Sequence, residues 1–97
     1  MVSQELLASW ARTEALLLAA RALLSPEVER QHQTAILEIV EFLEHNELGL
    51  AFDWLKSVAE ESQWESVELL AVLVLAAENM KRIDQASLLR QRILALT

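Results

Sequence analysis

The sequence contains no cysteine and only one glycine and one proline among its 97 residues. Without cysteine the chain can form neither a disulfide framework nor a thiolate site, which is typical of proteins in reducing compartments. Few residues are suited to tight turns between strands, because glycine and proline are strong turn formers. Hydrophobic residues make up 54% of the chain, a composition far from that of disordered proteins. These features predict a single all-α domain over residues 1–97, with long helices.

Long hydrophobic runs are also absent. The longest is LLAVLVLAA at residues 69–77, whereas a membrane-spanning helix needs about 20 apolar residues. The chain begins Met-Val-Ser-Gln-Glu and shows no basic stretch followed by an apolar block, so no secretory signal is predicted. We therefore expect a soluble, cytoplasmic protein without a membrane partner.

Basic residues are outnumbered, with 8 against 15 acidic residues and a net charge of −7. Nine of the acids lie between Glu38 and Glu68, a segment in which Lys56 is the single base. The rest of the chain is close to neutral. A negative field of this kind repels nucleic-acid phosphates and anionic lipids and attracts basic protein surfaces. The charge pattern therefore predicts a basic protein partner and no nucleic acid.

Hydrophobic periodicity predicts a compact bundle of four to five helices. In residues 3–24, apolar side chains recur at alternating steps of three and four residues, which places them on one helical face. Similar patterns predict further helices over residues 26–45, 47–61, 63–81 and 84–96. Residues that favour helix caps stand at the expected boundaries, namely Ser3, Ser25, Asn46, Ser62 and Asp84. Ser62 and Glu65 together also match the capping-box pattern.

The only glycine, Gly49, falls on the predicted outer face of the third helix, within the stretch EFLEHNELGLAFDWL at residues 41–55. Inside a helix, glycine lowers stability by about 1 kcal/mol relative to alanine. Either Gly49 lies so near the helix start that this loss is small, or another backbone approaches it closely. The sequence leaves both interpretations open.

The residue types that carry catalysis and metal binding are scarce. Histidine occurs only as His32 and His45, while a zinc site needs three or four converging ligands. Each serine has a more ordinary role as a helix cap or surface residue, so no activated nucleophile is evident. A single glycine cannot build a glycine-rich phosphate loop. The sequence therefore predicts a protein that is not an enzyme and uses no metal and no cofactor.

Three tryptophans remain to be placed. Trp10 lies on the apolar face of the first predicted helix and is expected in the core. Trp54 lies at the edge of the inner face of the third helix, and Trp64 in the first turn of the fourth. Boundary tryptophans beside acids are frequent anchors of protein interfaces. They can equally cover the end of a small bundle, because large aromatic residues are often only partly buried.

The segment EFLEHNELGLAFDWLKSVAEE, residues 41–61, carries a distinctive pattern. An acidic and apolar helix end is followed by E-x-G-x-A-x-acid-x-L and then by a double acid. The pattern resembles the small helical immunity proteins of bacterial polymorphic toxin systems, the MafI-type family and relatives encoded with contact-dependent growth inhibition toxins. The segment LAAENMKRID, residues 75–84, is similar to the same families. The resemblance spans roughly residues 36–90.

This resemblance implies a cytosolic antitoxin that binds the toxic domain of a cognate effector, often a nuclease, and blocks its active site or substrate-binding face. Charge supports the same mechanism, because an acidic pair of helices can occupy a basic cleft and compete with nucleic acid for it. With no side chain, Gly49 would let the toxin approach the helix backbone. The predicted contact surface comprises Glu41, Glu44, Glu47, Gly49, Asp53, Trp54, Glu60, Glu61, Trp64 and Glu65.

An alternative function is a helical homodimerisation or adaptor module without a toxin partner. Four leucines lie off the predicted inner faces and are available for such contacts, namely Leu37, Leu50, Leu88 and Leu94. Single leucines scattered over a surface are nevertheless ordinary. A small-ligand regulator is less favoured, because an 11 kDa bundle offers little room for a pocket of several hundred Å³.

Overall fold

The computed structural model describes residues 3–62 and 66–97. This part of the chain is all-α, as predicted, but it contains six helices rather than four to five. They are α1 (Gln4–Ala22), α2 (Pro26–Gln31), α3 (Gln33–Glu44), α4 (Leu48–Ser62), α5 (Val67–Asn79) and α6 (Ile83–Leu96). None of these helices is both long enough and apolar enough to cross a bilayer.

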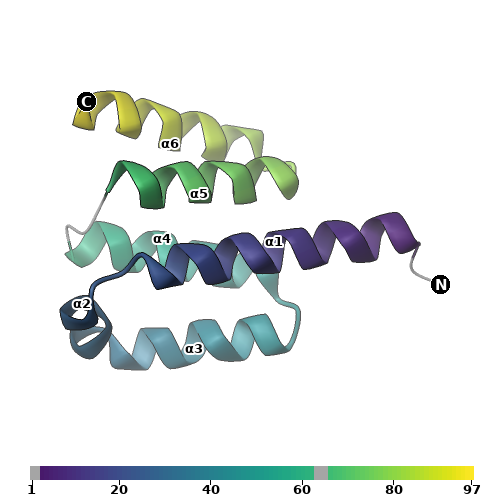
Figure 1. Cartoon of the computed structure of the whole chain (residues 1–97), viewed down its shortest axis with the longest axis horizontal. Coiled ribbons are helices and arrows are strands. Elements are labelled where there is room, and N and C mark those ends of the chain that lie inside the picture. Colours follow the sequence, from purple (N-terminus) through teal and green to yellow (C-terminus); the bar gives the residue numbers. More distant parts are fainter. Residues whose placement is uncertain (1–2, 63–65) are drawn as a thin grey trace.

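The additional helix arises because the segment predicted as one helix over residues 26–45 is broken at His32. There the backbone leaves the helical region, with φ −115° and ψ 33°. Figure 1 shows α2 nearly end-on beside the start of α3, so the chain changes direction at this residue. Neither glycine nor proline marks the break, and the apolar periodicity continues across it. The prediction of one continuous helix is therefore wrong. Apolar periodicity shows which residues share a helix face, but it does not show whether the helix axis changes direction.

Two of the predicted N-caps are confirmed. The Oγ of Ser3 accepts a hydrogen bond from the N–H of Leu6 at 3.1 Å. The Oγ of Ser25 accepts one from the N–H of Val28 at 3.1 Å, and Pro26 occupies the first turn of α2. Each serine thereby satisfies one of the N–H groups that a helix start leaves without an internal partner.

The helix start predicted just after Ser62 is wrong, whereas the capping-box bonds between Ser62 and Glu65 fall outside the described residues. Ser62 is the last residue of α4, and its Oγ donates a hydrogen bond to the carbonyl of Val58 at 2.6 Å. The next helix begins at Val67 instead of residue 63, and Ser66 caps it by accepting from the N–H of Leu69 at 3.0 Å. Serine can bond to a carbonyl four residues earlier as readily as it caps a following helix, so its presence at a boundary does not fix which helix it serves. Glu65 lies outside the described residues.

Helices α3 and α5 end in the same kind of turn. Asn46 and Lys81 adopt left-handed conformations, with φ 57° and 62°. In each turn the following N–H bonds back to a carbonyl five residues earlier, Glu47 to Phe42 and Arg82 to Ala77, both at 2.8 Å. This is the Schellman motif. Asn46 thus ends its helix as predicted, but it does not cap the next one, because α4 begins at Leu48 and Glu47 directly precedes it.

Asp84, predicted as the N-cap of the last helix, lies within the first turn of α6, which begins one residue earlier. An acidic residue there still interacts favourably with the helix dipole. The residue at the cap position is Arg82, and its side chain makes no capping hydrogen bond. The error of one or two residues reflects the turn at Lys81, whose left-handed conformation was not predicted.

The helices form a flat stack that measures 41 × 29 × 17 Å. Figure 1 shows α6 beside α5, then α1 lying across α4, then α3. Helix α5 packs against α6 and α1, while α4 packs against α3 and α1. We refer to α3 and α4 (residues 33–62) as the acidic hairpin, and to α5 and α6 (residues 67–96) as the C-terminal hairpin. Helix α1 joins them, and both left-handed turns lie at the same end of the stack.

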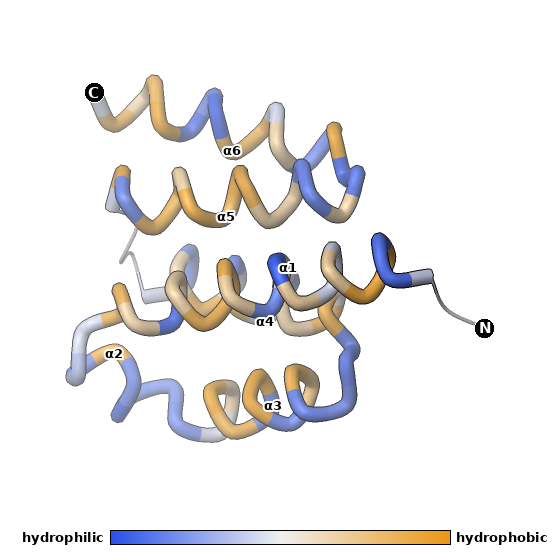
Figure 2. The backbone as a smooth tube through the Cα atoms, turned by 45° about the vertical axis from the view of Figure 1, so that its right-hand side comes forward, coloured by the Kyte–Doolittle hydropathy of each residue, from blue (hydrophilic) through white to orange (hydrophobic). Residues whose placement is uncertain are grey.

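The hydrophobic core runs through the stack as one cluster of buried residues. Its largest fully buried side chains are Leu17, Ile39, Phe52, Leu55, Leu69, Leu70 and Leu73. Figure 2 shows α5 as the most continuously hydrophobic helix and the connection between α3 and α4 as hydrophilic. The central position predicted for the segment at residues 69–77 follows from this pattern, because a helix that is apolar nearly all round needs neighbours on several sides.

One buried polar link ties α1 to the C-terminal hairpin. Asn79, at the end of α5, donates from Nδ2 to the Oγ1 of Thr13 at 2.7 Å and to the carbonyl of Ser9 at 2.8 Å. Thr13 is only 1% exposed. Because buried polar groups are costly unless they are hydrogen-bonded, this link favours one alignment of α1 against α5.

Candidate functional site

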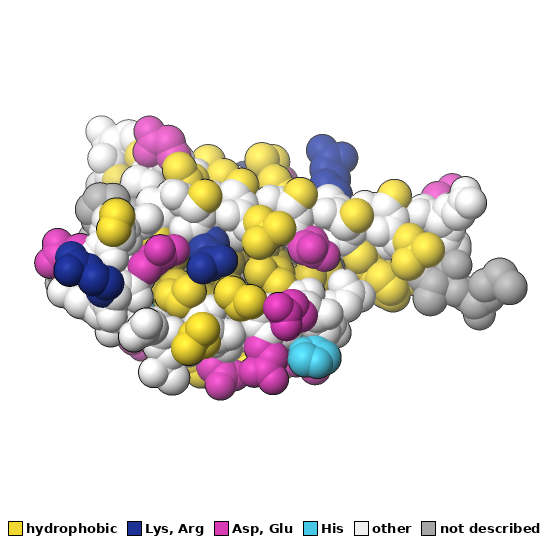
Figure 3. Space-filling model, turned by 60° about the horizontal axis from the view of Figure 1, so that its bottom comes forward, with side chains coloured by type: hydrophobic (Ala, Val, Ile, Leu, Met, Phe, Trp, Pro, Cys, Tyr) yellow, Lys and Arg dark blue, Asp and Glu magenta, His cyan; other side chains and the backbone are white. Residues whose placement is uncertain are grey.

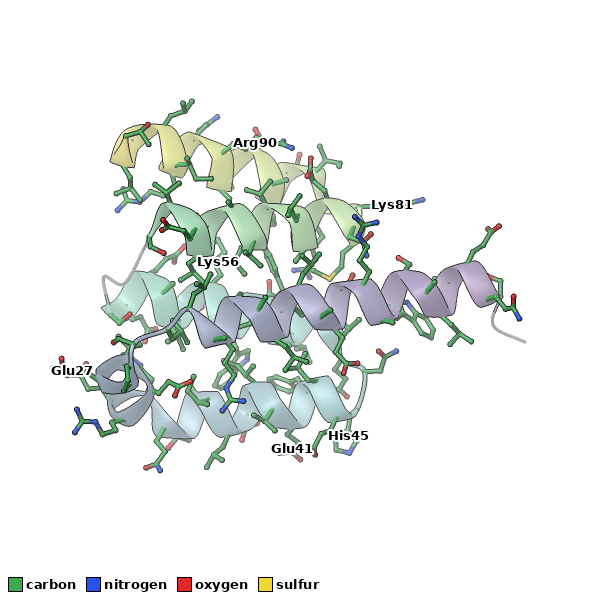
Figure 4. The ribbon with its side chains drawn as sticks, in the orientation of Figure 1. Glu27, Glu41, His45, Lys56, Lys81 and Arg90 are labelled. Carbon is green, nitrogen blue, oxygen red and sulfur yellow. The ribbon has the colours of Figure 1, made fainter. Side chains whose placement is uncertain are left out.

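The residues predicted to contact a partner come mainly from the acidic hairpin. Glu41, Glu44, Glu47, Glu60, Glu61 and Trp54 are exposed, while Gly49 and Asp53 are partly buried. Trp64 and Glu65 lie outside the described residues. Figure 4 shows Glu41 and His45 projecting from α3, away from the rest of the bundle. The hairpin thus gathers eight of the ten predicted residues.

These residues divide between two sides of α4. Gly49, Asp53 and Glu60 recur at steps of four and seven residues, which places them on one side of the helix. Trp54 and Glu61 are seven residues apart and lie on the side toward α3, where Trp54 packs against Phe42. Asp53 lies near both groups, because it also lines a surface groove together with Trp54 and Glu61.

Asp53 is engaged within the chain. Its Oδ1 accepts a hydrogen bond from Nη1 of Arg82 at 2.7 Å, which links α4 to the turn between α5 and α6. The guanidinium carbon of Arg82 also lies 5.5 Å from the centre of the Phe52 ring, within the range of a cation–π interaction. Arg82 therefore neutralises much of the charge that Asp53 could offer to a partner. The sequence analysis did not single out Arg82, because the two residues lie 29 positions apart.

Gly49 lies in the first turn of α4, as one of the two interpretations requires. A group does approach it, but that group is the side chain of Arg82 and not another backbone. A Cβ atom at position 49 would lie 3.3 Å from Nη2 of Arg82 and 3.7 Å from its guanidinium carbon. Gly49 thus makes room for the contact between Arg82 and α4, and a role in binding a partner stays a prediction.

Glu60 and Glu47 also have local structural roles. The side chain of Glu60 lies 3.2 Å from Nζ of Lys56, one turn earlier on α4. Glu47 immediately precedes Leu48, the first residue of α4, so its charge lies near the favourable positive end of that helix dipole. Neither residue requires a partner protein to explain its position.

Three of the acids lack such an explanation, namely Glu41, Glu44 and Glu61. Within the described part of the chain none of them forms an ion pair. Glu41 and Glu44 lie in the last turn of α3, and Glu61 in the last turn of α4. An acid at the negative end of a helix dipole lowers stability by about 0.3–1 kcal/mol. Repulsion between Glu41 and Glu44, three residues apart, adds to this loss.

The remaining helices differ from α3 and α4 in their first turns. Helices α1, α2, α5 and α6 each have an acidic residue in the first turn. Helices α3 and α4 have none there and no basic residue in the last turn. Helix α5 also carries an acid, Glu78, in its last turn, but Arg90 pairs with it. Among the described residues, unpaired acids in the last turn of a helix therefore lie in the acidic hairpin. Figure 3 shows acidic side chains gathered beside a histidine at the lower edge of the molecule, away from the basic side chains.

Trp54 lies over a shallow groove between α3 and α4. The groove has a volume of about 300 Å³ and is lined by Ala35, Asp53, Trp54, Ser57, Val58 and Glu61. Trp54 is 36% exposed, and its ring meets that of Phe42 edge-on, with the centroids 5.7 Å apart. The contact with Phe42 restricts the orientation of the indole.

The sequence analysis missed the contribution of α3 to this groove. Ala35, Glu38 and Phe42 are spaced at steps of three and four residues, which places them on one side of α3. Glu38 forms no ion pair with any described residue. The spacing could have revealed the wall, but only the antiparallel packing of α3 on α4 shows that it faces Trp54.

A larger hollow of about 480 Å³ lies where α1 meets the two left-handed turns. The expectation that the bundle offers little room for a space of this size is therefore wrong. Trp10, predicted in the core, is partly exposed and lines this hollow. The polar groups of Ser9, Thr13 and Asn79 in its lining are already hydrogen-bonded to one another, which leaves little chemistry to hold a ligand.

Across residues 3–62 and 66–97, no three His, Cys, Asp or Glu side chains are grouped so that they could hold a metal ion. The Nδ1 of His45 lies 2.9 Å from the backbone carbonyl of Glu41 in the same helical turn. His32 lies at the break between α2 and α3.

Comparison with known proteins gives no match: no family model matches the chain, and neither a curated protein nor a solved structure does.

Proposed function

We propose that this chain is an immunity protein that binds a cognate bacterial toxin domain through the acidic hairpin and neutralises it, with a nuclease as the expected class of toxin. The observation that carries the proposal is the position of Glu41, Glu44 and Glu61. These charges lie where they lower the stability of their own helices, and no described residue compensates them. Departures from local rules of this kind are expected at functional sites.

The arrangement suits a basic partner. Glu41 and Glu44 lie near one end of the hairpin and Glu61 near the other, because α3 and α4 run in opposite directions. Helix α4 has 15 residues, so at 1.5 Å per residue this acidic band extends roughly 20 Å. That length is comparable to one side of an ordinary protein interface. Trp54 lies between the ends of the band as an aromatic anchor.

The mechanism is competition for a basic cleft. A nuclease binds phosphate with basic side chains, and the acidic hairpin offers carboxylates to the same groups. Charges at the rim of an interface chiefly raise the rate of association, while buried aromatic contacts slow dissociation. The resemblance of residues 41–61 and 75–84 to immunity proteins supports this mechanism from the sequence side.

The decisive experiment uses the cognate toxin domain that the proposal requires, sought among the genes beside that of this chain. Purified protein should inhibit that domain, and association should slow markedly between 0.01 M and 0.15 M salt, as the Debye length falls from about 30 Å to about 8 Å. The triple variant Glu41→Gln/Glu44→Gln/Glu61→Gln should associate about tenfold more slowly at low salt, because steering depends on local charge.

A matched control is Glu5→Gln/Glu14→Gln/Glu68→Gln, which changes the net charge equally on α1 and α5. It should retain most of the association rate, with thermal unfolding measured for both variants. An equal loss in the control would show that net charge and not the hairpin is responsible. Absence of inhibition by the unmodified protein would refute the immunity function.

The second candidate is a homodimerisation or adaptor module. In its favour, the four leucines predicted for such contacts are all exposed, and Leu37 and Leu94 reach 65% and 74%. Against it, Leu88 and Leu94 are six residues apart on α6 and point about 120° apart, and Leu37 and Leu50 lie on two other helices. Light scattering across a range of concentrations distinguishes the two candidates, since a dimer at micromolar concentration would favour the module.

A further inference from the structure

We propose that the groove under Trp54 binds one arginine side chain of the partner, with the guanidinium against the indole and its charge paired with Glu61. The inference rests on the proposed function for the source of that arginine. It goes further by naming the chemical group that is recognised and the place where it binds.

The shape of the groove favours a single long side chain. Trp54, Ser57, Val58 and Glu61 are spaced at i, i+3, i+4 and i+7 along one side of α4, and Ala35 of α3 forms the opposite wall. Alanine and serine keep the walls low, so the groove is open at the surface. Its volume of about 300 Å³ lies at the lower limit for small-molecule pockets and is too small for a helix to enter.

The position of the indole suits a cation. Phe42 meets the Trp54 ring edge-on, which holds the indole in place without covering it, and 36% of the residue stays exposed. Tryptophan offers the strongest aromatic surface for a cation. A ring that is already held in place loses less conformational freedom when it binds.

The charge around the groove also favours a cationic side chain. Glu61 is exposed and forms no ion pair with any described residue, while Asp53 is already bonded to Arg82. One uncompensated carboxylate, that of Glu61, therefore lines the groove together with the Trp54 indole. Such a site disfavours phosphate and acidic side chains, and a purely apolar side chain would leave the carboxylate of Glu61 without an ion pair.

Arginine fits better than lysine. Its planar guanidinium can lie flat against an indole while it donates to a carboxylate, and it is less strongly hydrated than an ammonium group. The same chain already shows this pairing internally, where Arg82 lies over Phe52 and bonds to Asp53. The groove at Trp54 presents an aromatic ring and a carboxylate of the same kind, but without the arginine.

The test is independent of the toxin. The indole N–H signals of the full chain are followed by NMR during titration with acetyl-Gly-Arg-Gly-amide, and the Trp54 signal is assigned with Trp54→Phe. The neutral control is the same peptide with citrulline, which keeps the shape of arginine but lacks its charge. We expect the Trp54 signal to move at millimolar arginine peptide and the Trp10 signal to stay, with no response to citrulline.

Glu61→Gln should weaken this response by about two- to fivefold, as expected for an exposed ion pair. Glu27→Gln on α2 serves as the matched control and should leave the response unchanged. Movement of Trp54 with both peptides, or with neither, overturns the proposal. An equal response to acetyl-Gly-Lys-Gly-amide overturns the choice of arginine.

Failure of the groove and failure of the proposed function give different results. If the toxin domain is inhibited but the arginine peptide leaves Trp54 unmoved, the groove assignment is wrong and the immunity function stands. If Trp54 responds to the peptide but no toxin domain binds, the groove is correct and the proposed function is wrong.

Discussion

The acidic hairpin and the C-terminal hairpin share a turn but differ in charge. Both have a left-handed residue, Asn46 or Lys81, and the same backbone hydrogen bond of 2.8 Å across the turn. Residues 33–62 hold seven acidic side chains and one basic, whereas residues 67–96 hold three acidic and four basic. The same turn conformation thus occurs in two hairpins that differ in net charge. The turn explains the fold of each hairpin, and the charge requires a separate explanation.

The charges of the C-terminal hairpin serve the fold. Arg90 of α6 pairs with Glu78 of α5, and Arg82 pairs with Asp53 of α4. In the acidic hairpin only Asp53 and Glu60 are paired among the described residues. The acidic hairpin therefore keeps five of its seven carboxylates without an ion pair to a described residue, which the proposed function assigns to a basic partner.

Burial differs between the second helices of the two hairpins, and this gives the largest expected effect. Helix α4 buries six residues, including Phe52 at 0% exposure, while α6 buries only Ala86 and Leu89. Phe52→Ala should lower the free energy of unfolding by about 3–5 kcal/mol through the cavity it leaves. Leu89→Ala should fall near the lower end of its usual range, about 2 kcal/mol. Urea unfolding followed by circular dichroism measures both, and an equal or larger loss at Leu89 would show that α6 is not peripheral.

Removing the hydrogen bonds between α1 and the C-terminal hairpin should lower the stability by an intermediate amount. Asn79→Ala should lower stability by about 1–3 kcal/mol, because it leaves the buried hydroxyl of Thr13 without its donor. The double variant with Thr13→Val should lose less than the sum of the two single variants, since it removes both partners. Strict additivity in the same urea experiment would mean that the two side chains do not interact in solution.

The smallest expected effect is a change in stability whose sign differs between the two hairpins. Glu44→Gln, in the last turn of α3, should raise stability by about 0.3–1 kcal/mol at low salt, because it removes a charge at the unfavourable end of the dipole. The matched variant Glu68→Gln, in the first turn of α5, should lower stability by a similar amount. Thermal unfolding at 0.01 M and 1 M salt measures both, and each difference should shrink at high salt. A change of the same sign in both variants would remove the electrostatic contrast between the hairpins.

Much of the fold could be predicted from the sequence because local signals agreed with one another. Ser3 and Ser25 cap their helices as predicted, and Asn46 ends α3. The break at His32 could not be predicted, because no helix-breaking residue marks it and the apolar periodicity continues across it. The helix start after Ser62 was misplaced because serine can bond to the helix behind it or cap the helix ahead.

The candidate site was predicted less completely, because its residues interact with residues that are far away in the sequence. The acids of residues 41–61 were visible as a charge pattern, but their individual roles depend on Arg82, which lies 29 positions beyond Asp53. Gly49 likewise required the position of Arg82 to explain it. The wall of the groove at Ala35 and Phe42 appears only when α3 packs on α4.

The sequence by itself determined the all-α fold, most helix ends and the concentration of negative charge in the middle of the chain. Each of these depends on residues within a few positions of one another, where periodicity, capping and charge spacing act directly. Only the tertiary structure decided which carboxylates are neutralised within the chain and which remain uncompensated. That distinction depends on contacts between helices far apart in sequence, and ion pairing is decided by distances of a few ångströms that no local pattern specifies.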